Sequence, residues 1–194
     1  MANYKIVLLA GDGIGPEISN VTKNILQYLS LKNNFTITFE EKLIGGAAIT
    51  QTGSPLPIET LEACKNSDAV LMASIGNPAF DNLPRDQRPE TGLLQLRAGL
   101  ELFANIRPVK IWPALIEAST LKHQVIEGVD LMVVRELTGG IYFGEPKGRI
   151  KTEKGERAFN TMTYSSLEIE RIAKVAFNLS MERRNKICSI DKAN

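Results

Sequence analysis

The first thirty residues join a strand to a helix through a turn rich in glycine. Residues 4–10 are an apolar run of strand length, and residues 16–31 repeat apolar side chains at the spacing of an amphipathic helix. Pro16 suits the first turn of that helix. Further strand-like and helix-like segments alternate along the chain, which predicts a largely parallel sheet with helices on its faces. The predicted fold class is therefore α/β.

The remaining elements follow from the same kind of periodicity. We expect helices at residues 58–66, 91–103 and 165–184, a buried strand at 69–74, and strands at 131–136 and 186–194. Ser165 and Glu168 have the spacing of a capping box at the start of the last helix. Residues 144–163 are polar and have no helical period, which indicates either a solvated loop or a projecting arm between subunits.

The glycine turn does not match a dinucleotide-binding fingerprint. Gly11, Gly13 and Gly15 are spaced two apart, and Pro16 occupies the position after them. The fingerprint needs glycines at the first, third and sixth positions and an acidic residue about twenty residues later, which is also missing. The spacing alone favours a tight turn whose glycines adopt positive φ angles.

Composition excludes several classes of function. A net charge of +1 provides no strong field for nucleic acid or an anionic membrane, and the apolar run at 4–10 is too short for a membrane span or a signal peptide. A single histidine, His123, argues against most zinc sites and against a histidine-based triad, and we expect it at the surface. Cys64 and Cys188 lack the C-x-x-C spacing, so we expect two buried thiols in a reducing compartment.

A helix after Pro89 carries an unusual face. Glu90, Leu93, Leu94 and Arg97 are spaced at 0, 3, 4 and 7 and therefore share one side of the helix. One interpretation is a buried stripe whose arginine extends to solvent. The other is a pocket for a ligand that has an aliphatic branch beside a carboxylate.

Two further arginines and a tyrosine stand at the ends of elements. Arg107 precedes Pro108 in a non-helical segment, and Arg135 ends an apolar strand, where a guanidinium needs an anion. The anion is either a ligand carboxylate or a structural partner such as Glu136 or Glu101. Tyr142 follows two glycines in a turn, where packing is the simplest role.

Taken together, the motifs resemble the family of decarboxylating β-hydroxyacid dehydrogenases, which act on isopropylmalate, isocitrate, homoisocitrate or tartrate. The similar segments are residues 10–17, 43–49, 88–97 (RPETGLLQLR), 103–108 (FANIRP), 134–144 (VRELTGGIYFG) and 189–194 (SIDKAN). The resemblance implies an isocitrate/isopropylmalate dehydrogenase-like fold that binds its nicotinamide cofactor without a Rossmann domain. It implies that residues 1–104 are part of a first α/β domain completed by a more C-terminal segment. Residues 105–194 then belong to a second, dimerisation domain with an arm around 144–163.

The resemblance also implies a role for individual residues. Arg97, Arg107 and Arg135 would bind the malate carboxylates, since arginine pairs well with carboxylates. Tyr142 would protonate the enolate carbon, and Lys192 would act as the base, reaching into the partner's site. The residues expected on the NAD side are Ile14, Gly76, Asn77, Glu90 and Asn194. Here the chain departs from the family pattern, because Asn77, Ala79 and Phe80 stand where relatives have a glycine and a lysine–aromatic pair.

The resemblance predicts the following reaction. Leu93 and Leu94 favour a substrate with an aliphatic branch, so we expect NAD-dependent oxidative decarboxylation of 3-isopropylmalate to 4-methyl-2-oxopentanoate, in leucine biosynthesis, by a cytoplasmic homodimer. The Mg²⁺ or Mn²⁺ ligands and the adenine pocket are expected beyond residue 194, so we expect the 194-residue chain alone to be inactive. The alternatives are an inactive fragment that associates with a complete subunit, or a sibling enzyme for homoisocitrate or tartrate.

Overall fold

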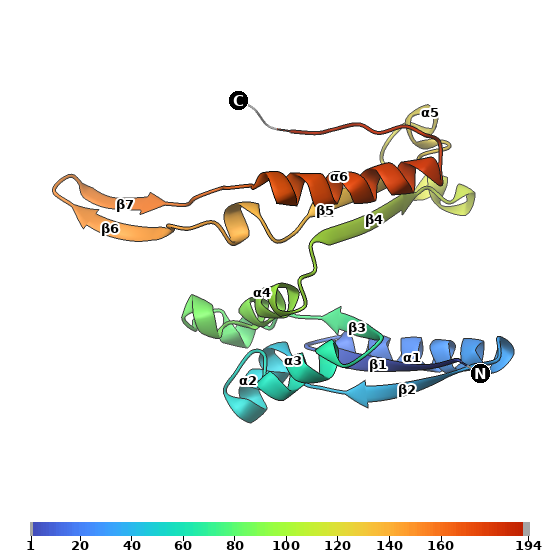
Figure 1. Cartoon of the computed structure of the whole chain (residues 1–194), viewed down its shortest axis with the longest axis horizontal. Helices are drawn as coiled ribbons and strands as arrows, with labels where there is room; N and C mark the ends of the chain where they lie inside the picture. The colour runs from blue at the N-terminus through green and yellow to red at the C-terminus, as the bar shows by residue number, and fades with distance from the viewer. Residues whose placement is uncertain (1, 192–194) are drawn as a thin grey trace. The chain divides into compact units, whose positions relative to one another are not determined.

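The computed structural model describes residues 2–191, and the chain divides into two compact units between Glu101 and Leu102. The elements of the first unit (unit 1) are β1 (Ala2–Gly11), α1 (Gly15–Lys32), β2 (Phe35–Glu41), α2 (Gly45–Thr52), α3 (Ile58–Lys65), β3 (Ala69–Ser74), the short 3-10 helices η1 (Pro78–Phe80) and η2 (Arg85–Gln87), and α4 (Pro89–Gly99) (Figure 1). Those of the second (unit 2) are β4 (Ala104–Lys110), η3 (Pro113–Ala118), α5 (His123–Ile126), β5 (Asp130–Glu136), η4 (Gly140–Tyr142), β6 (Gly148–Thr152), β7 (Gly155–Phe159) and α6 (Ser166–Met181).

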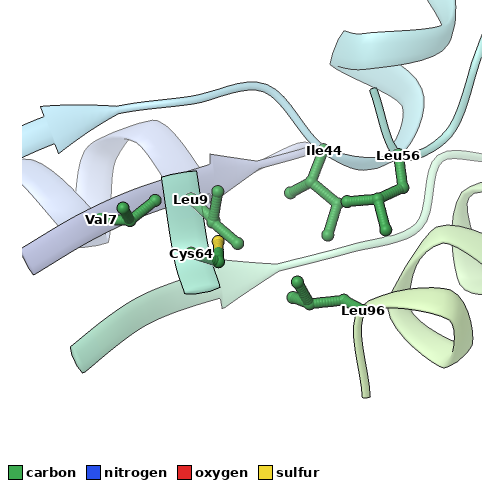
Figure 2. Close-up of a cluster of buried hydrophobic side chains, with 6 residues drawn as sticks. All are labelled: Val7, Leu9, Ile44, Leu56, Cys64 and Leu96. Carbon is green, nitrogen blue, oxygen red and sulfur yellow. The ribbon is translucent and has the colours of Figure 1, made fainter. Parts of the chain in front are cut away.

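Unit 1 is built on a parallel sheet with the strand order β2-β1-β3. Val7 and Leu9 of the central strand are fully buried and point to the same face, because side chains alternate along a strand. They pack with Ile44, Leu56, Cys64 and Leu96, which come from the α2, α3 and α4 region (Figure 2). Leu8 is buried on the opposite face, and α1 packs across all three strands. Helices therefore cover both faces, as a parallel sheet requires, and the predicted α/β fold is confirmed.

Unit 2 contains two separate antiparallel pairs instead of a parallel sheet. β4 pairs with β5 from Ala104 opposite Glu136 to Lys110 opposite Asp130. α6 packs on β5, and the predicted capping box of Ser165 and Glu168 is present at its start. The prediction of a largely parallel sheet therefore holds in unit 1 and is wrong in unit 2. β6 and β7 form a hairpin of mostly exposed residues inside the polar stretch 144–163.

Other predicted elements need correction. The helix expected at 91–103 runs from Pro89 to Gly99, and Glu101 then adopts a positive φ of 53° before β4 begins. The strand expected at 69–74 is β3, but its residues are half-buried or exposed. The strand expected at 186–194 is absent over residues 186–191, which are exposed and pair with no strand in the described chain; residues 192–194 lie outside it. None of the helices within residues 2–191 combines the length and the apolar character needed to cross a membrane.

Candidate active site

The glycine turn between β1 and α1 is a tight turn, as its spacing predicts. Gly11 and Gly13 have φ angles of 68° and 56°, in the left-handed region that favours glycine. Gly15 starts α1 with an ordinary φ, but a side chain there would collide with the carbonyl oxygen of Ala10. The turn is thus shaped by backbone geometry.

Asp12 organises this end of unit 1 and was not singled out from the sequence. Its side chain is buried and accepts three backbone N–H bonds, at 2.9 Å from Gly46, 2.8 Å from Ala47 and 3.0 Å from Gly76. The first two donors begin α2, where a carboxylate also suits the positive end of the helix dipole. The third donor belongs to the loop after β3. One carboxylate therefore ties together three segments at the C-terminal edge of the sheet, where α/β folds place ligands.

Three of the predicted cofactor-side residues meet around this loop. Gly76 has a φ of 126°, and a Cβ atom added to it would lie 3.3 Å from Oε1 of Glu90. The backbone of Gly76 and the exposed Glu90 side chain are therefore neighbours. Asn77 uses its side chain to accept from the amide of Ala79 at 3.0 Å, which caps η1. Ile14 occupies the N-cap position of α1 without a side-chain hydrogen bond to the helix, and it is 59% exposed.

The face of α4 that carries the predicted substrate residues is not a buried stripe. The buried residues of this helix are Pro89, Gly92 and Leu96, of which Leu96 joins the unit 1 core and Gly92 lies against Pro55. Leu93, Leu94 and Arg97 lie on other sides of the helix and are only half-buried. Two leucines that remain accessible beside an arginine offer a surface for an aliphatic, anionic ligand.

The other two predicted arginines share one face of the β4–β5 pair. Asn105 lies opposite Arg135, and Arg107 lies opposite Val133, so the four side chains point to the same side. Arg107 Nε donates to Asn105 Oδ1 at 2.5 Å. Both arginines are exposed. Within the described residues, no carboxylate forms an ion pair with either arginine, so neither Glu136 nor Glu101 is the structural partner of Arg135.

Tyr142 belongs to the same group. The Arg135 guanidinium lies over the Tyr142 ring, with 5.5 Å between its carbon and the ring centroid. Tyr142 is 44% exposed. The structure brings Arg107, Arg135 and Tyr142 to one part of unit 2, while Arg97, Leu93, Leu94, Ile14, Gly76, Asn77 and Glu90 belong to unit 1.

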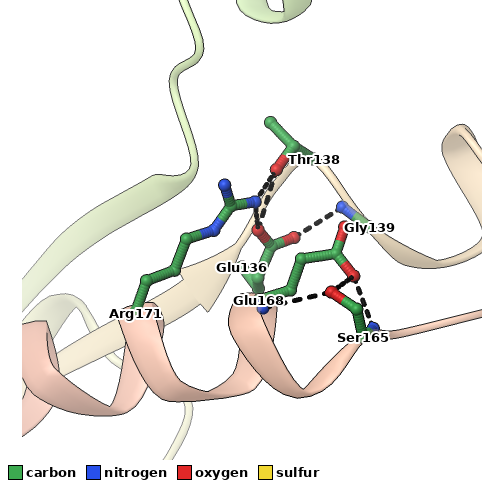
Figure 3. A network of polar contacts seen from close by, with 6 residues as sticks. All are labelled: Glu136, Thr138, Gly139, Ser165, Glu168 and Arg171. Atoms are coloured by element: carbon green, nitrogen blue, oxygen red, sulfur yellow. Dashed lines mark hydrogen bonds and ion pairs between the residues drawn. The ribbon is translucent and has the colours of Figure 1, made fainter.

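Behind this face, Glu136 forms a polar network with α6 (Figure 3). It accepts from Arg171 at 2.6 Å and from the amide of Gly139 at 2.6 Å. Burial by itself raises the pKa of the Glu136 carboxyl, but the hydrogen bonds from Gly139, Arg171 and Thr138 outweigh burial and lower the pKa below its usual value. Glu136 is thus held as a carboxylate, and sequence periodicity gave no sign of its partner on α6.

The remaining predictions concern a base, a cofactor contact, metal ligands, a surface histidine and buried thiols. Lys192 and Asn194 lie outside the described residues. Within residues 2–191 no group of three or more acidic, histidine or cysteine side chains is arranged to hold a metal ion. His123 is at the surface as expected, beside Glu127. Cys64 is buried as expected, but Cys188 is exposed because residues 186–191 form no strand that would cover it.

Comparisons with known proteins agree on one family. Residues 5–194 match the family model described as isocitrate/isopropylmalate dehydrogenase. The chain is 67% identical over 194 residues to the 3-isopropylmalate dehydrogenase of Synechococcus sp. (strain CC9605), and 70% identical over 195 residues to the enzyme of the same name from Prochlorococcus marinus. Each match covers all of this chain and 54% of the relative. The chain therefore spans about half the length of these curated relatives.

Solved structures of the same kind of dehydrogenase are also similar to this chain, at lower sequence identity. The isocitrate dehydrogenase of Methylococcus capsulatus superposes with a TM-score of 0.74 at 26% identity, covering 93% of this chain and 48% of that one. A β-decarboxylating dehydrogenase of Thermococcus kodakarensis has a TM-score of 0.62 at 27% identity, covering 93% and 46%.

Proposed function

The chain belongs to the isocitrate/isopropylmalate dehydrogenase family, and from this premise we propose that it provides the substrate arginines and the proton donor for NAD-dependent oxidative decarboxylation of 3-isopropylmalate. The observation that carries the proposal is the grouping of Arg107, Arg135 and Tyr142 on one side of the β4–β5 pair. Two guanidinium groups without a carboxylate partner in the described residues suit a dianionic ligand. A tyrosine hydroxyl beside them suits proton transfer to the bound ligand.

The branched side chain of the substrate is proposed to meet Leu93 and Leu94. These residues are half-buried beside Arg97, so a ligand reaching Arg97 has an aliphatic surface within reach of its side chain. A third carboxylate, as in isocitrate, would meet two leucines there and would lose its hydration without a partner. This chemistry favours isopropylmalate over isocitrate.

The proposed reaction balances with these groups. Lys192 would take the proton of the C2 hydroxyl, and NAD, when bound, would be the oxidant that accepts the C2 hydrogen with two electrons. The bond from C3 to its carboxylate then breaks, carbon dioxide leaves, and its electrons form an enolate. Tyr142 donates a proton to C3, which gives 4-methyl-2-oxopentanoate. Arg107 and Arg135 hold the remaining charges in place throughout.

The fit to NAD rests on the loop after β3. Gly76 has a backbone conformation that L side chains rarely adopt, and a Cβ atom there would crowd Glu90. A bare backbone beside Glu90 and near the β1–α1 turn is suited to close approach by a flat ring. Gly76, Asn77, Glu90 and Ile14 would hold the nicotinamide side of the cofactor. The described residues do not fit a divalent metal site, so Mg²⁺ or Mn²⁺ would need ligands from elsewhere.

The same premise extends to assembly and location. We propose that the second unit takes part in a homodimer, with the β6–β7 hairpin as an arm, and that residues 1–104 are completed by a more C-terminal segment. Apolar side chains exposed on α6 support an interface, with Leu167 69%, Phe177 60% and Met181 65% exposed. From the proposed substrate we also propose a role in leucine biosynthesis, and from two cysteines without C-x-x-C spacing we propose a reducing, cytoplasmic location.

The test uses an extended protein in which the 194 residues are followed by the part of the Synechococcus sp. (strain CC9605) relative that this chain does not cover. Arg107→Ala and Arg135→Ala should each lower kcat/KM for isopropylmalate about 10- to 150-fold, since losing a charged hydrogen-bond partner costs about 1.5–3 kcal/mol. The KM for NAD should change far less. Lys65→Ala, which removes an exposed cation paired with Glu62 on α3, is the control. Equal effects of all three substitutions would refute the assignment.

A further inference from the structure

The last two residues of β5 face opposite sides of the β4–β5 pair. Arg135 contacts the ring of Tyr142 on one side. Glu136 points to the other side, because successive side chains of a strand alternate. There it meets Arg171 of α6 (Figure 3). A contact made by Glu136 therefore reaches the turn before Tyr142 from behind, without entering the face that carries the arginines.

Both oxygens of the Glu136 carboxylate are occupied. Oε1 accepts from Arg171 Nη2 at 2.6 Å and from the Thr138 hydroxyl at 2.9 Å. Oε2 accepts from the amide of Gly139 at 2.6 Å. The Glu136 side chain is only 9% exposed, whereas that of Arg171 is 30% exposed, so the carboxylate is the better shielded partner of this pair. The carboxylate thus holds the first residue of the turn at a fixed distance from the end of β5.

The turn itself depends on outside contacts for its shape. Gly139 and Gly140 are consecutive, and glycine restricts the backbone less than any other residue. Gly140 has a φ of 77° and donates its amide to the carbonyl of Thr163 at 2.8 Å. The ring of Tyr164 lies so close that a side chain on either glycine would collide with it. Glu136 supplies the only side-chain carboxylate bond to this turn among the described residues.

Arg171 makes its contacts with a single nitrogen atom. Nη2 bonds both Glu136 Oε1 and the Thr138 hydroxyl, and the guanidinium stacks on Phe103, 4.8 Å from the ring centroid. Its Nε is buried and has no acceptor in the described part of the chain. A buried donor left unpaired is unfavourable. The bonds of Nη2 to Glu136 and Thr138 and the contact with Phe103 therefore hold Arg171 at this position, while its Nε stays unpaired among the described residues.

A second arginine provides the natural comparison. Arg183, just after α6, pairs with Asp130 at 2.7 Å, at the opposite end of β5. Twelve helical residues rise about 18 Å, and the six steps of β5 span about 20 Å, so the two pairs fasten the same helix to the two ends of the same strand. Only the Arg171 pair lies next to the Tyr142 turn.

We propose that Arg171 and Glu136 are positioning residues for Tyr142. They act on proton transfer through the turn that carries the tyrosine and do not touch substrate. The inference rests on the proton-donor role proposed for Tyr142. The inference adds that the Arg171–Glu136 ion pair, on the face of the β4–β5 pair opposite Arg135, sets the position of the Tyr142 hydroxyl relative to C3 of the ligand.

The test measures proton transfer at C3 without hydride transfer. In the extended protein with NAD and Mg²⁺, 4-methyl-2-oxopentanoate is incubated in D₂O, and proton NMR follows the exchange of its C3 hydrogens. Arg171→Met should slow this exchange about 10- to 100-fold, since displacement of a reacting group by about 1 Å costs up to that much. The KM for isopropylmalate should stay unchanged. Arg171→Lys should retain most of the rate, because one ammonium nitrogen can bond Glu136 and Thr138.

Arg183→Met is the matched control, since it also removes a pair between α6 and β5. It should change the exchange rate by no more than about twofold, the usual range for a surface substitution. Arg171→Met should add little to the loss already caused by Tyr142→Phe, because both act on one step. If Arg171→Met and Arg183→Met slow exchange equally, or if the loss from Arg171→Met is the same in the Tyr142→Phe background, the positioning role is refuted.

The inference and the proposed function fail in different ways. An extended protein that neither reduces NAD with isopropylmalate nor exchanges the C3 hydrogens contradicts the proposed function. Backbone amide hydrogen exchange then decides the positioning role on its own. The backbone amides of Gly139 to Tyr142 should exchange faster in Arg171→Met than in Arg183→Met. If Arg171→Met fails to fold, Glu136→Gln takes its place and should also exchange faster than Arg183→Met. Equal protection in these variants would overturn the inference.

Discussion

Replacing Asp12 by asparagine should destabilise unit 1 far more than its conservative shape suggests. The carboxylate accepts two amides on Oδ2, from Gly46 and Gly76, and one on Oδ1, from Ala47. Asparagine has one carbonyl oxygen, and its NH₂ group would face an N–H donor at the other position. At least one buried amide therefore loses its acceptor, and the remaining bonds lose their charge.

The expected magnitude follows from these contacts. An orphaned buried donor costs about 1–3 kcal/mol, and turning a charge-assisted bond into a neutral one costs about 1 kcal/mol. One orphaned amide and two bonds that lose their charge give about 3–5 kcal/mol for Asp12→Asn, a large part of a typical stability of about 5–15 kcal/mol. With a denaturant slope of about 2 kcal/mol per M, the urea midpoint should fall by about 1.5–2.5 M.

The assay is urea unfolding of the 194-residue chain, followed by circular dichroism at the helix band. Asp68→Asn is the matched control, because Asp68 accepts a single exposed amide bond, from Lys5 at 2.7 Å, which one carbonyl oxygen can still accept. That variant should shift the free energy of unfolding by no more than about 0.5 kcal/mol. Similar midpoints for the two variants would refute the view that Asp12 holds three segments together.

Three further predictions concern the proposed site and its support. Replacing Leu93 and Leu94 with alanine in the extended protein should lower the preference for isopropylmalate over malate, by about 1–3 kcal/mol per lost hydrophobic contact; an unchanged ratio of kcat/KM values returns both leucines to packing. Tyr142→Phe should slow protonation at C3 and Lys192→Ala should slow hydride transfer, each by about 10²–10⁴; a substrate deuterated at C2 should therefore show a larger isotope effect on kcat in the lysine variant than in the tyrosine variant. The lowered pKa of Glu136 means that its stabilisation is complete above the unfolded value of about 4.3 and is lost as the pH falls through the folded value; the thermal midpoints of wild type and Glu136→Gln should therefore differ at pH 7, the difference should shrink as the pH falls below about 4.3, and a constant difference would contradict the assignment.

Local periodicity was sufficient to predict much of unit 1. The apolar repeat of α1 and the run of β1 are properties of short windows, and both elements formed as expected. The capping box was recognisable because two residues three positions apart, Ser165 and Glu168, define it. β2 was overlooked although Phe35, Ile37 and Phe39 alternate with polar residues, a period-2 signal that the sequence does carry.

The failures have identifiable physical causes. β4 was not predicted, because the segment around Pro108 was interpreted only as non-helical. Pro108 is tolerated there, since β4 pairs with β5 alone among the described residues and its other edge needs no N–H donor. The segment 186–191 contains Ile187 and Ile190 but has no neighbouring strand in the described chain, and a strand needs a partner.

Long-range polar contacts were not predictable from periodicity. Asp12 joins residues 34 to 64 positions away, and Arg171 meets Glu136 across 35 positions. No window of sequence contains both partners of these bonds. The acid between two glycines at a strand end was a signal for Asp12, whereas Arg171 gave none beyond its place on a helix.

The most direct test of the proposed function is the product balance of the extended protein with (2R,3S)-3-isopropylmalate, NAD and Mg²⁺. NADH is followed by absorbance, carbon dioxide by trapping, and the organic product by mass spectrometry. The account predicts equal amounts of NADH, carbon dioxide and 4-methyl-2-oxopentanoate, with much lower kcat/KM for isocitrate, homoisocitrate and tartrate. A protein that forms NADH faster from one of these other acids, or that forms NADH without carbon dioxide, would contradict it.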